Sequence, residues 1–289
     1  MDQKATEDRC PRPSREANGL AALRIAVALG IVATTLLACN PDTIALRYRF
    51  DEGTVATYRM DATAIAEWDI EGRGGGSYDI SFTVSETIET VAGDDATVVV
   101  DMEPESQDER GLPTPGLERR TFSLRLGPNG EVRAILNLDG VAGRQLDNEQ
   151  LAFIGTYRPA LPDAPVTPHD TWSARQEIAT GATFQQLDTT GRLDALHRDA
   201  RGRIAEIEFT GEGPLRWETE LPQGTALLDG DAHTRGDAIF DIDAGMLRSA
   251  TSVTSGDFEV RIVPGEGQAP ISGTLHLELE LTIEEARGS

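Results

Sequence analysis

Apolar and polar residues alternate along most of the chain beyond residue 45, the period-two pattern of half-buried β-strands. The pattern is clearest near the end of the chain, where Leu275, Leu277, Leu279 and Leu281 would share one face of a strand. We expect strands at Leu46–Phe50, Thr54–Ile70, Tyr78–Val91, Ala96–Glu103, Arg120–Leu126, Glu131–Leu138, Thr171–Ile178, Thr183–His197, Arg203–Phe209, Leu215–Leu221, Thr234–Asp241, Met246–Ser255, Phe258–Val263 and Ile271–Ile283. The sequence therefore predicts a mainly β protein, built from antiparallel curved sheets or partial barrels.

Turn-forming residues separate these segments. Glycines, asparagines and aspartates predict turns at Gly72–Ser77, Gly93–Asp95 and Gly127–Gly130, and the last of these is typical of a hairpin. Glu103–Gly116 is rich in proline and acidic residues, so we expect an exposed, mobile loop there.

One stretch favours a helix. Asp139 can cap a run over residues 141–154 whose apolar positions fall on one side, which predicts one central helix. The run ends at a proline-rich linker, residues 159–169, that separates an N-terminal β module with the helix (46–158) from a C-terminal β module (170–289). The two halves are alike in plan, so they are either a duplicated module or parts of a single sheet with the helix packed across it.

The first forty residues have the pattern of a targeting segment. Ile25–Leu37 is an uncharged stretch of 13 residues, too short to span a bilayer but typical of the hydrophobic part of a signal peptide. It ends in Leu-Leu-Ala-Cys at residues 36–39, which resembles the lipobox of bacterial lipoproteins. That resemblance implies cleavage between Ala38 and Cys39, loss of residues 1–38, and a diacylglycerol and palmitate on the Cys39 thiol. An ordinary secretory signal or a buried helix remains the alternative.

The same resemblance implies where the protein resides. Cys39 would begin a lipidated tether, residues 39–45, that holds the protein to a membrane of the cell envelope, at its periplasmic or surface face. Because Asn40 rather than aspartate follows the cysteine, the sorting rule of enteric bacteria favours the outer membrane.

Composition excludes several functional classes. The chain has 26 basic and 49 acidic residues, a net charge of −23, so attraction to nucleic acid or to an anionic membrane is not expected. After cleavage it would have no lysine and no cysteine other than Cys39, which excludes disulfides, Schiff-base chemistry, cysteine nucleophiles and phosphate-binding P-loops.

The remaining polar residues do not form a catalytic motif, so we predict no catalytic residues. The histidines lie too far apart for metal-ligand spacing, and none belongs to an HExxH motif. We expect His169 and His233 in turns, His197 at a strand end and His276 on the polar face of a strand. The metal candidates are aspartates at close spacing, which suit calcium, but they lack an EF-hand frame; they are Asp229, Asp231 and Asp237, with Asp241 and Asp243 nearby. We expect neither a metal nor an organic cofactor.

Three tryptophans lie in strand-like segments. Trp68, Trp172 and Trp217 are interpreted as anchors of the core, with Trp172 buried where the chain enters its second half. The alternative is that one or two of them line an apolar cavity on the inner face of a curved sheet.

Two further stretches resemble an uncharacterised family of β-rich bacterial lipoproteins. Leu161–Val166 followed by His169–Trp172 is similar to the family's proline-rich strand entry, with His169 in place of glycine. Gly236–Asp241 with Gly245–Leu247 is similar to one of its hairpins. The resemblance implies an envelope lipoprotein without a known activity. More distantly, a lipid-anchored curved sheet with a helix resembles periplasmic lipoprotein carriers and their receptors, an analogy of fold alone.

The leading hypothesis is a non-enzymatic envelope lipoprotein whose β domain binds an apolar, lipid-like ligand or a protein partner. One alternative is a structural or assembly lipoprotein with a solid core and no ligand. The other is a hydrolase that uses paired carboxylates.

Overall fold

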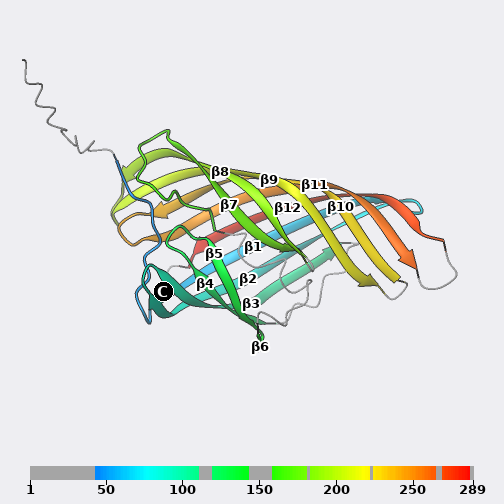
Figure 1. The fold of residues 1–289 in the computed structure, drawn as a ribbon, viewed down its shortest axis with the longest axis horizontal. Coiled ribbons are helices and arrows are strands. Elements are labelled where there is room, and N and C mark those ends of the chain that lie inside the picture. Colours follow the sequence, from blue (N-terminus) through cyan, green and yellow to red (C-terminus); the bar gives the residue numbers. More distant parts are fainter. Residues whose placement is uncertain are drawn as a thin grey trace, which may run out of the picture. The chain divides into compact units, whose positions relative to one another are not determined.

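The structure is a computed structural model that describes residues 43–110, 119–142, 158–180, 183–221, 224–264 and 269–286. They belong to one compact unit, Asn40–Ser289, and their strands form a single antiparallel sheet (Figure 1). The strands are β1 (Val55–Asp69), β2 (Arg73–Ala92), β3 (Asp95–Arg110), β4 (Arg120–Leu126), β5 (Val132–Leu138), β6 (Val141–Ala142), β7 (Thr171–Thr180), β8 (Thr183–Arg198), β9 (Arg203–Leu221), β10 (Gly224–Asp241), β11 (Met246–Pro264) and β12 (Ile271–Glu285). The prediction of a mainly β, antiparallel fold is confirmed.

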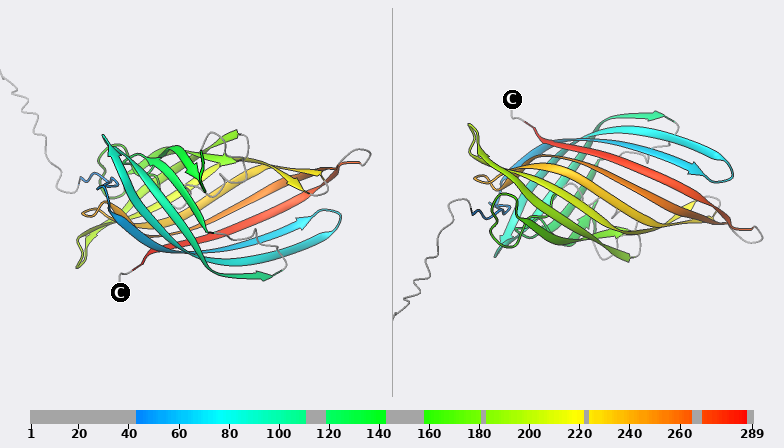
Figure 2. Two further views of the ribbon diagram at one scale, coloured as in Figure 1. Left: turned by 90° about the horizontal axis from the view of Figure 1, so that it is seen from below. Right: turned by 90° about the horizontal axis from the view of Figure 1, so that it is seen from above.

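The first and last strands lie side by side in the middle of this sheet. β1 lies beside β12, and the spatial order is β6-β5-β4-β3-β2-β1-β12-β11-β10-β9-β8-β7. The first half therefore runs outward to one edge, and the second half begins at the opposite edge and runs back to the centre. The sheet twists and curls so that both edges lean over the same face (Figure 2). We call this face the inner face.

The described residues contain no helix. Of the predicted central helix, Val141 and Ala142 form the short strand β6 instead, paired with β5, because the turn at Asp139–Gly140 reverses the chain into the sheet edge. Residues 143–154 lie outside the described residues.

Several strands are longer than the sequence predicts, since glycines that suggested breaks lie within them. Arg203–Phe209 and Leu215–Leu221 are one continuous strand, β9, and Met246–Ser255 and Phe258–Val263 are one strand, β11. β10 likewise begins ten residues before the predicted Thr234.

Two segments expected to be irregular also pair in the sheet. The prediction of a glycine-rich turn at Gly72–Ser77 is wrong beyond Gly72, because β2 begins at Arg73 and pairs with β1 up to the end of that strand. The expected loop at Glu103–Gly116 is strand as far as Arg110, because β3 pairs with the long β2. The expected turn Gly127–Gly130 is present, with the Gly130 amide donating to the Gly127 carbonyl.

Two extended segments close one end of the curled sheet. Leu46–Phe50, expected as a strand, contains no strand residues; instead the Tyr48 amide donates to the Pro128 carbonyl and the Arg49 amide to the Gly245 carbonyl. The proline-rich stretch packs inside the molecule, with Leu161 1% exposed and its amide bonded to the Asn129 carbonyl. The segment that begins at Thr43 lies at this end of the strands in Figure 2.

Candidate functional site on the inner face of the sheet

The inner face is divided along the direction of its strands into two different surfaces. At the end closed by the two extended segments, which we call the packed end, large apolar side chains from both halves of the sheet form one core. Its fully buried members include Leu46, Val84, Val98, Val100, Leu124, Leu126, Leu161, Leu193, Ile207, Phe240, Leu247 and Ile283.

Toward the other end of the strands, alanines replace the large side chains on the inner face of β1. We call this region the open end and define it by Ala62, Ala64 and Ala66 of β1 with Leu275, Leu277 and Leu279 of β12. The register places the residues in pairs, Ala64 beside Leu279 and Ala66 beside Leu277. The alanines are buried between the neighbouring strands, whereas the three leucines are only half-buried. The side chains alternate as predicted, because Glu278 and Glu280 are exposed on the opposite, outer face.

Aromatic side chains at the open end lie along the sheet instead of filling the space above it. A Cβ atom added at Gly74 would meet the Trp68 ring at 2.5 Å, and one at Gly256 would meet the Phe258 ring at 2.7 Å. Aromatic rings that lie over strand glycines stabilise the sheet locally but project little above it. This arrangement explains why glycines occur inside the long strands.

An open hollow of about 850 Å³ lies at the far end of these strands, and residues from both faces of the sheet line it. Apolar or glycine positions from five neighbouring strands line it, in a single row across the sheet: Gly230, Phe258, Leu275, Trp68 and Gly74. Charged residues of the adjoining rows complete the lining, among them Asp229, Asp257 and His276.

The predicted metal candidates do not gather into a site. Asp229, Asp231 and Asp237 all lie on the outer side of β10, and Asp229 pairs with Arg216 at 2.9 Å. Asp237 lies eight residues from Asp229, about 26 Å along an extended strand. Within the described ranges, no group of three or more histidine, cysteine, aspartate or glutamate side chains is placed to hold a metal ion.

The histidines are dispersed in the structure as well. His276 lies on the outer face, with its Nδ1 2.8 Å from the Asp257 carboxylate. His233, expected in a turn, lies within β10 and faces Glu212 at 4.0 Å. His197 is near the end of β8 and His169 is in a turn, both as predicted.

The other sequence candidates divide between the two ends. Trp172 is buried at the packed end, as predicted, and its Nε1–H donates to the Ala160 carbonyl at 2.9 Å. Trp68 lines the hollow at the open end. The side chain of Trp217, and the cleavage and lipidation residues Ala38 and Cys39, lie outside what the structure describes.

The sequence analysis missed a buried ion pair at the packed end. The Arg158 guanidinium donates to both carboxylate oxygens of Glu86, and these side chains are only 8% and 5% exposed. The guanidinium also lies 5.0 Å from the centre of the Tyr48 ring. Burial raises the pKa of Tyr48 to about 12, and burial likewise raises the pKa of Tyr58. An alternating pattern cannot reveal such a pair, since Glu86 occupies an inward position of β2 that the pattern assigns to an apolar residue.

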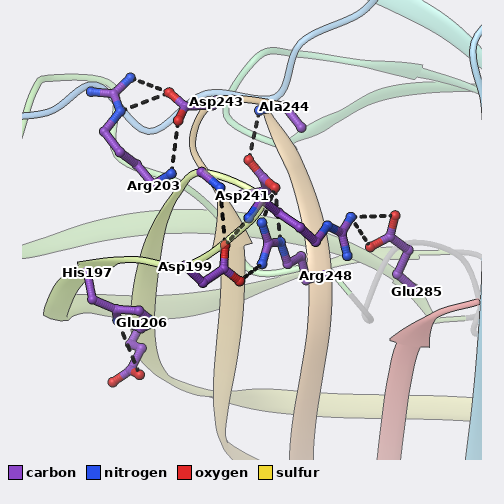
Figure 3. A network of polar contacts seen from close by, with 11 residues as sticks. His197, Asp199, Arg203, Glu206, Asp241, Asp243, Ala244, Arg248 and Glu285 are labelled. Atoms are coloured by element: carbon purple, nitrogen blue, oxygen red, sulfur yellow. Dashed lines mark hydrogen bonds and ion pairs between the residues drawn. The ribbon is translucent and has the colours of Figure 1, made fainter. Parts of the chain in front are cut away.

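A second polar network joins the turns at the packed end (Figure 3). The Arg248 guanidinium donates to Asp241 and to Asp199, and Arg203 pairs with Asp243 at 2.6 Å. Arg248 and the amides of Arg201 and Gly202 hold the pKa of Asp199 down at about 2. These contacts satisfy the carboxylates, so the network is organised to join turns.

No family model matches the chain, and no curated protein matches it. Among solved structures, a chain described as "Lipid-protein interactions in lipovitellin" is similar with a TM-score of 0.42 and 13% identity, over 82% of this chain and 25% of that one. A likeness at this TM-score carries no argument about function. The described residues include no helix that is long and apolar enough to cross a membrane.

Proposed function

We propose that the chain is a non-enzymatic lipoprotein of the cell envelope whose inner face binds an apolar, lipid-like ligand at the open end. The observation that carries this proposal is the row of half-buried leucines, Leu275, Leu277 and Leu279, that continues the inner face beyond its packed core. Water in contact with this surface costs free energy, at about 25 cal/mol per Å² of apolar area that a ligand could cover.

The shape of the open end favours a ligand over a solid core. Alanines form the floor beside the leucine row, and the nearby aromatic rings lie over glycines, so these side chains fill little of the space on the inner side of the curled sheet. Small-molecule sites are concave, largely apolar and formed before the ligand arrives. In the structural alternative, a lipoprotein without a ligand, no molecule binds at the open end.

A binding measurement tests whether an apolar ligand occupies the inner face. It compares a substitution on the inner face with a control substitution on the outer face. Leu277→Glu places a charge on the inner face of β12, whereas Ile65→Glu places one at an exposed position of the neighbouring strand β1. We expect protein purified gently without its anchor to carry a hydrophobic molecule in native mass spectrometry, and to bind a fluorescent fatty acid. Leu277→Glu should weaken fatty-acid binding at least tenfold and Ile65→Glu should leave it unchanged. Absence of both the molecule and the binding would favour the structural alternative.

The second part of the proposal is the anchor. The lipobox-like residues 36–39 support acylation of Cys39, with release of residues 1–38 and retention at a membrane, which we propose to be the outer membrane. Each buried CH₂ of an acyl chain contributes roughly 0.8 kcal/mol, so several chains hold even a highly acidic protein.

Metabolic labelling tests the anchor. The wild-type chain should take up labelled palmitate and fractionate with membranes, and Cys39→Ser should do neither. If the wild-type protein takes up no label and distributes between the fractions as the Cys39→Ser variant does, the proposed anchor is contradicted.

An envelope protein remains the alternative partner of the open end. Co-purification of a stoichiometric protein in place of a lipid would indicate it.

A further inference from the structure

Two hollows flank the segment by which the chain enters the sheet. They measure about 570 and 330 Å³, and both are lined by Thr43, Ile44, Arg203 and Ile242. They therefore adjoin at the packed end, at the first described residue of the chain. Only residues 40–42 separate Thr43 from Cys39.

The charge of this surface differs from that of the whole chain. The lining of the two hollows contains four arginines, Arg47, Arg49, Arg198 and Arg203, against the two carboxylates of Asp51 and Asp94. In the whole chain, acidic residues outnumber basic ones by 49 to 26. We call these four exposed arginines the arginine mouth.

Part of the arginine mouth is not engaged within the protein. Arg203 pairs with Asp243, and Arg49 donates to the carbonyl of the same residue at 2.8 Å. Arg198 acts on Asp243 only as a nearby charge. Among the residues that the structure describes, Arg47 makes neither a hydrogen bond nor an ion pair.

We propose that the arginine mouth docks on the anionic phosphates of lipid headgroups in the membrane that holds Cys39. This inference rests on the proposed function, because it takes acylated Cys39 as the anchor. Four residues of chain reach at most about 14 Å, so the anchor keeps Thr43 and its neighbours close to the headgroups. Guanidinium groups bind phosphate oxygens in pairs, and positive side chains next to a membrane are drawn to its anionic lipids.

The tether explains how so few arginines suffice on so acidic a protein. It makes docking intramolecular, with a high effective concentration of headgroups, so weak contacts are populated. Salt screens the repulsion between the anionic headgroups and the more distant carboxylates of the protein, since the Debye length is about 8 Å at physiological ionic strength. Docking at the packed end would direct the far end of β1, about 50 Å along the strand, away from the membrane surface.

Arginine footprinting tests the proposal on the protein purified from membranes. The protein is reconstituted into vesicles of phosphatidylcholine alone or of phosphatidylcholine with phosphatidylglycerol, and arginines are modified with phenylglyoxal and read by peptide mass spectrometry. We expect phosphatidylglycerol to slow modification of Arg47, Arg49 and Arg198 several-fold. Arg73 and Arg216, exposed at the open end, should react equally in both vesicles.

Charge reversal provides the matched control. Arg47→Glu with Arg198→Glu should abolish the phosphatidylglycerol dependence at Arg49, whereas Arg73→Glu with Arg216→Glu, the same change in net charge, should preserve it. Equal reactivity of wild-type Arg47 in both vesicles would overturn the docking. The mass of the Cys39 peptide from the same sample separately decides the anchor, since an unmodified Cys39 overturns the proposed anchor and the docking with it.

Discussion

The two ends of the inner face are made from the same strands but follow different packing rules. At the packed end, β1 contributes Tyr58 and Met60 to a core that the extended segments cover, whereas at the open end it contributes alanines beside half-buried leucines. The alternation of apolar and polar residues is the same in both regions. Alternation therefore fixes which face points inward, and the size of the side chains and the covering segments decide whether that face is filled.

The sharpest test of this comparison uses two tryptophans in equivalent settings. Trp172 lies over Gly191 at the packed end and Trp68 lies over Gly74 at the open end. Trp172→Ala should cost about 3–5 kcal/mol of unfolding free energy, because it leaves a cavity and removes the bond to the Ala160 carbonyl. Trp68→Ala should cost about 1 kcal/mol, since its site is already open to water. Urea titrations measure both, and equal losses would contradict the division into two ends.

The buried ion pair gives the next largest effect. Glu86→Ala should cost about 3 kcal/mol, because it leaves the Arg158 guanidinium buried without its carboxylate. The double variant Glu86→Leu with Arg158→Met should recover most of that loss, since apolar residues of similar volume often replace a buried pair at little cost. Chemical denaturation checks both variants. A single variant as stable as the wild type would show that the pair does not fix the chain segment at Arg158 to the sheet.

These residues also mark how far the sequence predicts the fold and the site. Alternation predicted most strand locations and the inward face of β12, because burial of one face imposes a period of two on any half-buried strand. It wrongly broke β9 near Gly211 and β11 at Gly256, since it cannot show that Gly211 packs against the Leu187 side chain and Gly256 lies under the Phe258 ring. Nor could it place the leucine row beside an alanine floor, because the pairing of β1 with β12 joins segments from opposite ends of the chain.

Acid should loosen the packed end through its polar network. The pKa of Asp199 is lowered to about 2 in the fold, mainly by Arg248, against about 3.9 in an unfolded chain. Its contribution to stability is thus complete above pH 4 and is lost as the pH falls toward 2. Arg248→Gln should remove part of this dependence and flatten the acid limb of a stability–pH curve. Arg73→Gln, at an exposed pair of the open end, is the control and should not alter that limb.

The smallest effect is expected at the Tyr48 hydroxyl. This buried oxygen has no hydrogen-bond partner among the described residues, so Tyr48→Phe should change the unfolding free energy by less than about 1 kcal/mol at neutral pH, with either sign. The ring itself remains necessary, because it packs edge-on against Phe240 at 5.2 Å between centroids. Alkali separates the two roles, since burial raises the pKa of Tyr48 to about 12 while an unfolded tyrosine ionises near pH 10. The wild type should therefore lose stability as the pH rises from about 10 to 12, and Tyr48→Phe should lose less over that interval. Identical alkaline denaturation curves for the two proteins would show that the hydroxyl reaches water, and that the packed end is less tightly closed than its core indicates.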